Sequence, residues 1–318
     1  MDTSTDGEWT PHPWVIEGER KVRFGIAFWP LPDWPQLRLL VEQVEAFGFD
    51  SYWKEDHPLE EASRFDCWTL LTALAVTTST LRLGSFVSVI YYRSPLMLAR
   101  LAADVDRLSN GRLVLGLGIG SSADEFQQLG LPFPRVAERQ QALEETIAIV
   151  RGVWGERPFS YTGKHFQVQA VRVTPGPVQQ PHPPLLIAGE GERGTLRQVA
   201  RYADAANFGL GQVGPAEVRR KLDVLRHYCA EQGRPSASVL PTYMTFPLIL
   251  AETREALQPK LQLFSWSPAF AGTPEEACAY FRTLTEAGIR YFIIAMHGSD
   301  VETFHLLGQR VAPAVTAP

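Results

Sequence analysis

Residues 184–207 constrain the fold of this chain more than any other stretch. An apolar run at 185–188 has the length and character of a fully buried strand, and a break rich in glycine follows at 189–191. Helical periodicity then resumes, and a second strand-like run begins at 204. The apolar face of that helix is made by Leu196, Val199, Ala200 and Ala203. A strand, a glycine turn, a helix and a strand in this order predict a βαβ unit of a parallel sheet.

The glycine turn at 189–191 has two interpretations. A glycine turn that enters a helix presents free backbone N–H groups and the positive end of the helix dipole, and both favour a phosphate. Arg193 in the first helical turn would add a charge-assisted hydrogen bond. Alternatively, Gly189 and Gly191 only permit a tight strand-to-helix turn. The motif alone leaves both open, and the missing third glycine argues against a dinucleotide-binding fingerprint.

Strand-like runs alternate with helical segments along the chain. Strands are expected at 22–28, 49–53, 81–90, 111–117, 185–188, 204–208, 239–250 and 291–295. Helices are expected at about 34–47, 67–76, 95–105, 136–154, 195–203, 218–229, 273–287 and 301–309. Eight such pairs in 318 residues favour an α/β fold of the (β/α)₈ TIM-barrel type over a doubly wound sheet.

Two segments fall outside the alternation. Residues 1–20 are polar and proline-containing, and we expect an irregular N-terminal extension before a single domain at 21–318. Residues 159–173 alternate like a hairpin, which predicts an insertion at about 155–183, after the fourth strand and its helix.

Composition excludes several classes of function. The net charge is −5 without a basic block, so nucleic acid and membrane surfaces are not expected partners. No apolar run is long enough to cross a bilayer, and the N-terminus does not resemble a signal peptide. Three separated cysteines and seven scattered histidines match neither a disulfide framework nor a metal site. We therefore expect a cytoplasmic, metal-free protein that acts on a small molecule.

Polar and glycine residues gather where the predicted strands end, which is where a TIM barrel carries its active site. In strand order they are Asp56 and His57, then Tyr91, Tyr92 and Arg93, then Gly118, Ile119, Gly120 and Ser121, then Gly189, Glu190 and Gly191, then Asn207, and finally His297. Two separate glycine clusters suggest a flat ligand that lies against backbone at one end and has its phosphate held at the other.

Most of these residues also have a plain structural interpretation. Asp56-His57 suits acid/base chemistry, since imidazole titrates near neutrality, but an isolated Asp-His-Pro is more often a surface turn. Tyr91, Tyr92 and Arg93 either line a substrate pocket or cover the barrel mouth. Three further expectations concern Trp29, the best pocket candidate among the tryptophans, His165, a structural residue of the insertion, and Glu144 with Glu145, which we expect to face solvent.

Taken together, the motifs resemble the luciferase-like monooxygenase superfamily of flavin and deazaflavin oxidoreductases, from about Arg23 to the C-terminus. The motifs that carry the resemblance are Arg23-Phe-Gly-Ile, Gly48-Phe-Asp-Ser-Tyr-Trp with Asp56-His57, Leu83-Gly-Ser-Phe-Val-Ser-Val-Ile-Tyr-Tyr-Arg-Ser-Pro95, Gly111-Arg-Leu-Val-Leu-Gly-Leu-Gly-Ile-Gly120, Gly163-Lys-His-Phe, Ile187-Ala-Gly-Glu-Gly-Glu-Arg, Arg201-Tyr-Ala-Asp-Ala-Ala-Asn, and Gly272-Thr-Pro-Glu-Glu with Ala287-Gly-Ile. Each motif is weak alone, whereas their order and spacing are specific. The branch that uses coenzyme F420, a deazaflavin, is the most similar.

The resemblance implies a TIM barrel with a cis non-proline peptide at Phe86–Val87, behind the isoalloxazine ring. It places Asp56 and His57 at the deazaflavin ring, with His57 assisting proton movement, and the phosphate at Gly189-Glu190-Gly191. The implied cofactor-binding set is Asp56, Phe86, Val87, Gly118, Ile119, Gly120, Ala188, Gly189, Glu190, Gly191 and Arg193. The substrate pocket is expected at Trp29, Tyr91, Tyr92 and Asn207.

One position departs from the family pattern. The sugar-phosphate dehydrogenase of this family has an acidic residue after the strand-four glycines, where this chain has Ser121, so that reaction is not expected here. We expect hydride transfer between reduced F420 and a small organic substrate. The alternatives are an FMN-dependent, oxygen-using monooxygenase and a barrel that binds a flavin without turnover. Dimers are common in the family, so a homodimer is expected, with the N-terminal extension covering either a barrel mouth or a subunit contact.

Overall fold

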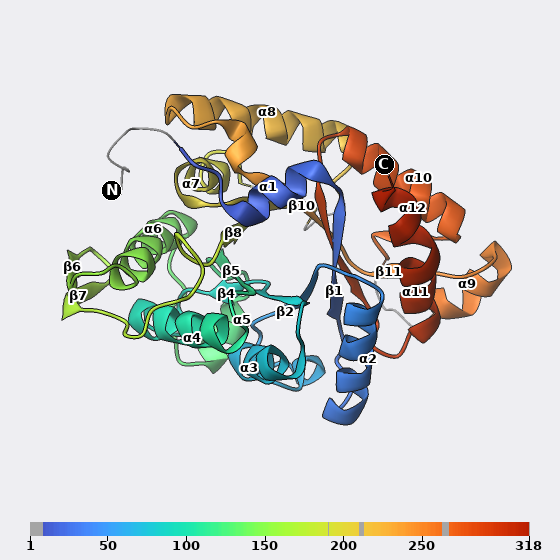
Figure 1. Ribbon diagram of the computed structural model, residues 1–318, viewed down its shortest axis with the longest axis horizontal. Helices are drawn as coiled ribbons and strands as arrows, with labels where there is room; N and C mark the ends of the chain where they lie inside the picture. The colour runs from blue at the N-terminus through green and yellow to red at the C-terminus, as the bar shows by residue number, and fades with distance from the viewer. Residues whose placement is uncertain (1–8, 190, 210–212, 263–266, 318) are drawn as a thin grey trace.

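The computed structural model describes residues 9–189, 191–209, 213–262 and 267–317, and its centre is a closed parallel β-barrel surrounded by helices (Figure 1). The barrel strands are β1 (Arg23–Phe28), β2 (Ser51–Lys54), β3 (Arg82–Ser85) with β4 (Ser88–Val89), β5 (Leu113–Gly118), β8 (Leu185–Ala188), β9 (Ala205–Phe208), β10 (Leu240–Thr245) and β13 (Tyr291–Met296). They pair in the order β3-β2-β1-β13-β10-β9-β8-β5-β4, and an additional β3–β5 pairing closes the ring. The predicted (β/α)₈ barrel is confirmed.

Helices follow the strands in the expected alternation. They are α2 (Trp34–Ala46), α3 (Cys67–Thr77), α4 (Pro95–Leu108), α5 (Ala123–Gln128), α6 (Val136–Val153), α7 (Thr195–Tyr202), α8 (Pro215–Glu231), α10 (Pro274–Glu286) and α11 (Val301–Leu306), which continues through η3 (Leu307–Val311) into α12 (Ala312–Thr316). Local chemistry explains several starts, since Asp33, Ser94 and Thr273 accept a hydrogen bond from a first-turn amide of α2, α4 and α10. Thr273 and Glu276 form a capping box at the start of α10.

Two predicted strands are interrupted. The run at 81–90 divides into β3 and β4 around a cis peptide between Phe86 and Val87, at the position that the family resemblance implied. The run at 239–250 divides at Pro247, which has no N–H to donate to a sheet. Its second part, β11 (Leu248–Leu250), leaves the barrel and pairs with β12 (Phe270–Gly272) in a separate sheet, with α9 (Arg254–Leu261) between them.

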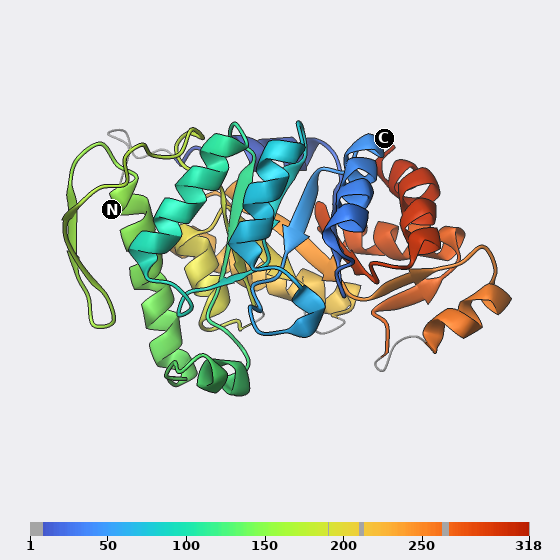
Figure 2. The same ribbon diagram turned by 90° about the horizontal axis from the view of Figure 1, so that it is seen from below.

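The insertion is an antiparallel hairpin of β6 (Phe159–Thr162) and β7 (Gln167–Val171) that follows α6. It lies at the edge of the molecule in both views, outside the ring of barrel helices (Figures 1 and 2). Its register agrees with the hairpin expected from the alternation at 159–173.

The N-terminal segment differs from the irregular extension that we expected. Residues Pro13–Arg20 form helix α1, and Trp14 and Val15 are fully buried. The Trp14 ring meets Tyr291 edge-on at 5.3 Å, and the buried Arg23 donates to the Trp14 carbonyl at 2.7 Å. Because Arg23 and Tyr291 begin their strands, α1 closes the N-terminal end of the barrel, opposite the predicted active site (Figure 2).

Trp53 fills the centre of the barrel. Its indole contacts the Tyr291 ring at 6.3 Å between centroids and the Phe86 ring at 5.7 Å, both edge-on. Gly25 and Gly84 face it from neighbouring strands, and a Cβ atom on Gly25 would lie 2.5 Å from Trp53 Nε1, while one on Gly84 would overlap the six-membered ring. The glycines are therefore needed for the space that Trp53 occupies.

Above this aromatic column several inward-facing positions are small. Ala27, Gly118, Ala188 and Ala295 lie near the carboxyl ends of their strands, and the larger Met244 and Phe246 pack at the same end. The barrel is thus packed with large rings at its N-terminal end and carries a mixture of small and large residues at its carboxyl end.

A Gly84→Ala variant should unfold at lower urea concentration than the wild type, with a loss of about 1–3 kcal/mol, because the new methyl group overlaps Trp53. Gly176→Ala is the matched control, since a Cβ atom there would meet its nearest atoms at 3.6 and 3.8 Å, which is ordinary contact, and the substitution should change stability by less than about 0.5 kcal/mol. Equal midpoints for the two variants would contradict the packing described for Trp53.

A Trp14→Ala variant should lose about 3–5 kcal/mol of unfolding free energy, because a fully buried indole leaves a cavity. The control is Trp9→Ala. Trp9 is 40% exposed and stacks on Arg234, so its removal should be worth about 1 kcal/mol or less. If both variants melt at the wild-type temperature, α1 does not close the barrel.

Candidate active site

Asp56 and Arg93 form a buried ion pair just beyond the end of β2. Asp56 is 1% exposed, and Arg93 donates through Nη1 to its Oδ2 at 2.6 Å while its other terminal nitrogen donates to Asp66. Burial raises the pKa of Asp56, and the charge of Arg93 opposes that rise. The guanidinium of Arg93 thus bridges two carboxylates, and its side chain is 17% exposed.

His57 is held by a carboxylate that sequence reasoning did not single out. Its Nδ1 lies 2.9 Å from Oε2 of Glu125, and the Tyr92 hydroxyl donates to the same oxygen at 2.6 Å. The His57 side chain is 39% exposed, whereas that of Glu125 is 11% exposed. Burial and the hydrogen bond to Glu125 raise the pKa of Tyr92 well above its usual range, so its hydroxyl remains a donor.

Glu125 lies in α5, at the carboxyl end of the barrel. The hydroxyl of Ser122 caps that helix by accepting from the Glu125 amide at 3.2 Å. In the sequence, Ser122-x-x-Glu125 has the form of a helix start, and that signal gave no reason to connect Glu125 with His57. The family pattern has an acidic residue at the position of Ser121. In this chain Glu125, four residues later and in α5, is the carboxylate that contacts His57.

Tyr91 belongs to an aromatic cluster beside the site. Its ring centroid lies 5.7 Å from that of Phe126 and 6.4 Å from that of Phe166, which the insertion contributes. Phe126 also contacts Tyr92 at 5.4 Å and Phe133 at 4.9 Å. The cluster packs the loops after β4 and β5 and the insertion against one another.

Two buried charges hold these loops. Glu145 accepts from the backbone amides of Lys164, His165 and Phe166 at 2.8–2.9 Å and is 4% exposed, so the expectation that it faces solvent is wrong. Helix α6 places the Glu145 carboxylate beside the hairpin turn, where three backbone N–H groups take the place of water as donors. Arg139 donates to the carbonyls of Ile119 and Gly120 and is also buried.

The carboxyl end of the barrel carries buried polar atoms that lack partners among the described residues. They include Asp56 Oδ1, Ser88 Oγ and Asn207 Nδ2, together with the Tyr91 hydroxyl and Thr245 Oγ1. Asn207 is oriented by Thr242, whose hydroxyl donates to Asn207 Oδ1 at 3.0 Å. Its NH₂ group therefore points away from Thr242 and lacks an acceptor, and a buried polar group without a partner is costly unless a ligand supplies one.

The other predicted positions are distributed around the same end of the barrel. Val87 and Gly118 are in contact, since a Cβ atom on Gly118 would lie 2.5 Å from Val87 Cγ2. Trp29, after β1, meets Phe246, after β10, edge-on at 5.6 Å. His297, after β13, accepts through Nδ1 from the Ser299 amide at 3.2 Å.

The helix predicted after the glycine turn is α7, but it begins at Thr195, so Arg193 lies before the helix and not in its first turn. Gly189 has φ of +140°, which favours glycine, and Gly194 precedes the helix without a capping side chain. Thr195 Oγ1 accepts from Gln140 at 3.3 Å, and Arg193 is exposed. Glu190 lies outside the described residues.

These features fit a planar heteroaromatic group. Val87 packs against Gly118 and makes this part of the site apolar, and the unpartnered polar atoms suit a ring with donors and acceptors on its edge. Within the described ranges, no three histidine, cysteine or carboxylate side chains are placed to hold a metal ion. The same ranges contain no helix with the length and apolar character of a membrane span.

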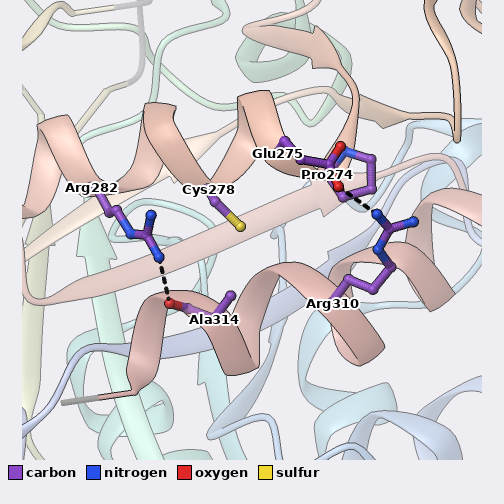
Figure 3. Close-up of a pocket in the computed structure, with 6 residues that line it drawn as sticks. All are labelled: Pro274, Glu275, Cys278, Arg282, Arg310 and Ala314. Atoms are coloured by element: carbon purple, nitrogen blue, oxygen red, sulfur yellow. Dashed lines mark hydrogen bonds and ion pairs between the residues drawn. The ribbon is translucent and has the colours of Figure 1, made fainter.

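A separate hollow lies on the outer helical layer (Figure 3). It has a volume of about 290 Å³ and lies between α10 and the C-terminal helices, where Arg310 binds Glu275 and Arg282 donates to the Ala314 carbonyl at 3.1 Å. None of the predicted site residues lines this hollow.

Comparisons with known proteins identify the family of this chain. The family model described as luciferase-like monooxygenase matches residues 13–290. Pyrimidine monooxygenase RutA of Variovorax paradoxus is 31% identical, with 73% of this chain aligned to 58% of that protein. RutA of Acinetobacter baylyi is 29% identical over 74% of this chain, which spans 64% of its length. An F420-dependent glucose-6-phosphate dehydrogenase of Amycolatopsis mediterranei is 25% identical over 82% of this chain and 88% of its own.

Solved structures share the fold. A coenzyme F420-dependent tetrahydromethanopterin reductase from Methanopyrus kandleri superposes with a TM-score of 0.78 at 20% identity, covering 92% of this chain and 99% of that one. The monooxygenase RslO1 from Streptomyces bottropensis superposes with a TM-score of 0.77 at 21% identity and the same coverage. The fold is therefore used with more than one chemistry.

An Arg93→Met variant should be less stable by about 3–5 kcal/mol at pH 8, because Asp56 is left buried without its counter-ion. Loss of Arg93 removes the influence that lowers the Asp56 pKa, so that pKa rises further. A carboxyl whose folded-state pKa is raised destabilises the fold only when it is ionised. The difference in unfolding free energy between wild type and variant should therefore shrink as the pH falls toward about 4.

Urea denaturation of wild type and variant at pH 8 and pH 4.5 measures this difference. Arg38→Met is the control, because Arg38 and Glu42 form an exposed pair whose loss is worth less than about 1 kcal/mol. A deficit that is the same at both pH values would exclude Asp56 as its source.

Proposed function

This chain belongs to the luciferase-like monooxygenase family, and we propose that it is an oxidoreductase that transfers a hydride between reduced coenzyme F420 and a small organic substrate. The observation that carries the proposal is the placement of His57. Its side chain is partly exposed at the carboxyl end of the barrel. Glu125 contacts its Nδ1, so that Nε2 is the ring nitrogen left for a substrate. An acid/base group in this position suits a reaction in which hydride and proton move separately.

The residues proposed to hold the cofactor come from five segments at the carboxyl end of the barrel, which follow or end β2, β3, β5, β8 and β9. Phe86, Val87 and Gly118 would support one face of the ring, and Asp56 and Asn207 would offer polar atoms at its edge. The turn around Gly189 and Gly191, with Ala188, Ile119, Gly120 and Arg193, would receive the phosphate-bearing chain. When bound, the deazaflavin supplies the hydride donor or acceptor, while the protein supplies orientation and electrostatics.

The proposed role of His57 is proton transfer. In the direction of substrate reduction, a carbon of the substrate receives the hydride and its neighbouring heteroatom receives a proton from protonated His57. In the reverse direction, His57 takes that proton as the hydride leaves. Trp29 is the proposed wall of the substrate pocket.

An FMN-dependent monooxygenase is the second candidate. It is favoured by the identity to the RutA proteins, which are named as monooxygenases. A deazaflavin does not form the oxygen adduct that a flavin forms, so oxygen consumption separates the two. A barrel that binds the ring without turnover would show neither oxygen consumption nor substrate-dependent bleaching.

The proposal includes a cytoplasmic homodimer. Leu39, Val76 and Met97 are exposed apolar side chains on the consecutive helices α2, α3 and α4, and such side chains support a subunit contact. The free thiols of Cys67, Cys229 and Cys278 suit a reducing compartment. Light scattering during gel filtration measures the mass, and a monomer at all concentrations would remove the dimer from the proposal.

Tryptophan-fluorescence titration of the apo protein tests the cofactor. F420 should quench with a dissociation constant in the micromolar range, about −8 kcal/mol, and FMN should bind at least tenfold more weakly. Gly189→Ala should weaken F420 binding by about tenfold or more, because its φ of +140° is unfavourable for alanine, whereas Gly214→Ala should not.

Activity tests the rest of the proposal. His57→Asn should retain F420 binding and lose about 10²–10⁴-fold in turnover, the range of a general acid or base. Tighter binding of FMN with substrate-dependent oxygen consumption would replace the F420 proposal with the monooxygenase. Binding of neither cofactor would reject both.

A further inference from the structure

We propose that Glu125 is a positioning residue that keeps His57 in the tautomer with the proton on Nδ1, so that Nε2 is the atom that exchanges the substrate proton. The inference deepens the proposed function and rests on it for its catalytic consequence. Its structural part, the tautomer, concerns this chain alone.

The hydrogen bonds at Glu125 determine which atom carries each proton. Oε2 of Glu125 lies 2.9 Å from His57 Nδ1 and 2.6 Å from the Tyr92 hydroxyl. An ionised carboxylate only accepts, so both neighbours must donate to it. A neutral imidazole has a single N–H, and a proton on Nδ1 leaves the lone pair on Nε2.

The hydrogen bonds at Glu125 fit a carboxylate oxygen that only accepts, because the hydroxyl of Tyr92 already donates to Oε2. The Ser122 hydroxyl accepts from the Glu125 amide and anchors the backbone that carries the carboxylate. The opposite arrangement, a protonated Glu125 that donates to Nδ1, would place the histidine proton on Nε2 and is the alternative that the experiment separates.

The consequence for the reaction is a defined path for one proton. In substrate oxidation, the carbon loses a hydride to the oxidised deazaflavin and the heteroatom loses its proton to Nε2, so that a double bond forms between them. His57 becomes an imidazolium whose Nδ1–H faces the negative charge of Glu125, which stabilises it. The reverse reaction returns the proton from Nε2. Glu125 would thus supply, through His57, the acidic function that Ser121 lacks.

The tautomer is measured on the apo protein labelled with ¹⁵N-histidine. Long-range ¹H–¹⁵N correlation spectra should show His57 with a protonated Nδ1 at a pH where the ring is neutral, and His57→Asn assigns the signal by its disappearance. Glu125→Ala should shift the signal toward the Nε2–H form, which is the more stable one in water. Asp124→Asn is the matched control, because Asp124 is the exposed carboxylate next along the same helix. Circular dichroism checks that each variant is folded.

The positioning role is measured by kinetics with F420. Glu125→Gln should lower kcat by about 10–100-fold, within the range of second-sphere partners, and leave KM within about twofold. Tyr92→Phe removes one of the two donors and should have a smaller effect, Glu125→Asp should recover part of the rate, and Asp124→Asn should match the wild type.

The outcomes are separable. A wild-type His57 with its proton on Nε2, or a tautomer unchanged in Glu125→Ala, overturns the inference whatever the activity. A full rate in Glu125→Gln overturns the positioning role. Absence of F420 binding in the wild type, together with the predicted tautomer, means that the proposed function has failed while the assignment of Glu125 and His57 stands.

Discussion

The space occupied by Trp53 determines how the rest of the barrel is built. Its indole lies at the axis between Tyr291 and Phe86, and it requires glycine at both Gly25 and Gly84. With α1 and Trp14 closing the end below, the lower part of the barrel has no room for a ligand. The small residues above Phe86 are therefore the place where a flat molecule can approach the axis, and the loops that surround them become the site.

Those loops are positioned by buried charges more than by regular structure. Arg93 bridges Asp56 and Asp66, Glu125 receives His57 and Tyr92, and Glu145 receives the amides of the insertion turn. Glu125 and Glu145 have specific partners, whereas one oxygen of Asp56, Oδ1, has no partner among the described residues. The His57 side chain is 39% exposed beside these groups, which suits a group that exchanges protons.

Sequence patterns predicted the strand count, the parallel order and most helix boundaries, because apolar runs and capping residues act over short distances. They also predicted that Asp56-His57 and the turn at Gly189 meet at the carboxyl end of the barrel. They missed α1, whose burial depends on Tyr291 and Arg23, far away in the chain. They also placed Glu145 in solvent, since nothing in a helical pattern shows that a hairpin turn will cover one of its carboxylates.

The sequence by itself determined the fold class, the family and the residues that stand at each strand end, because periodicity and motif spacing are properties of the chain. Only the tertiary structure decided which of those residues act on one another. Arg93 became the partner of Asp56 and Glu125 became the partner of His57 across 68 positions of sequence. A carboxylate within hydrogen-bonding distance of an imidazole alters its chemistry, and that distance exists only after the barrel has closed.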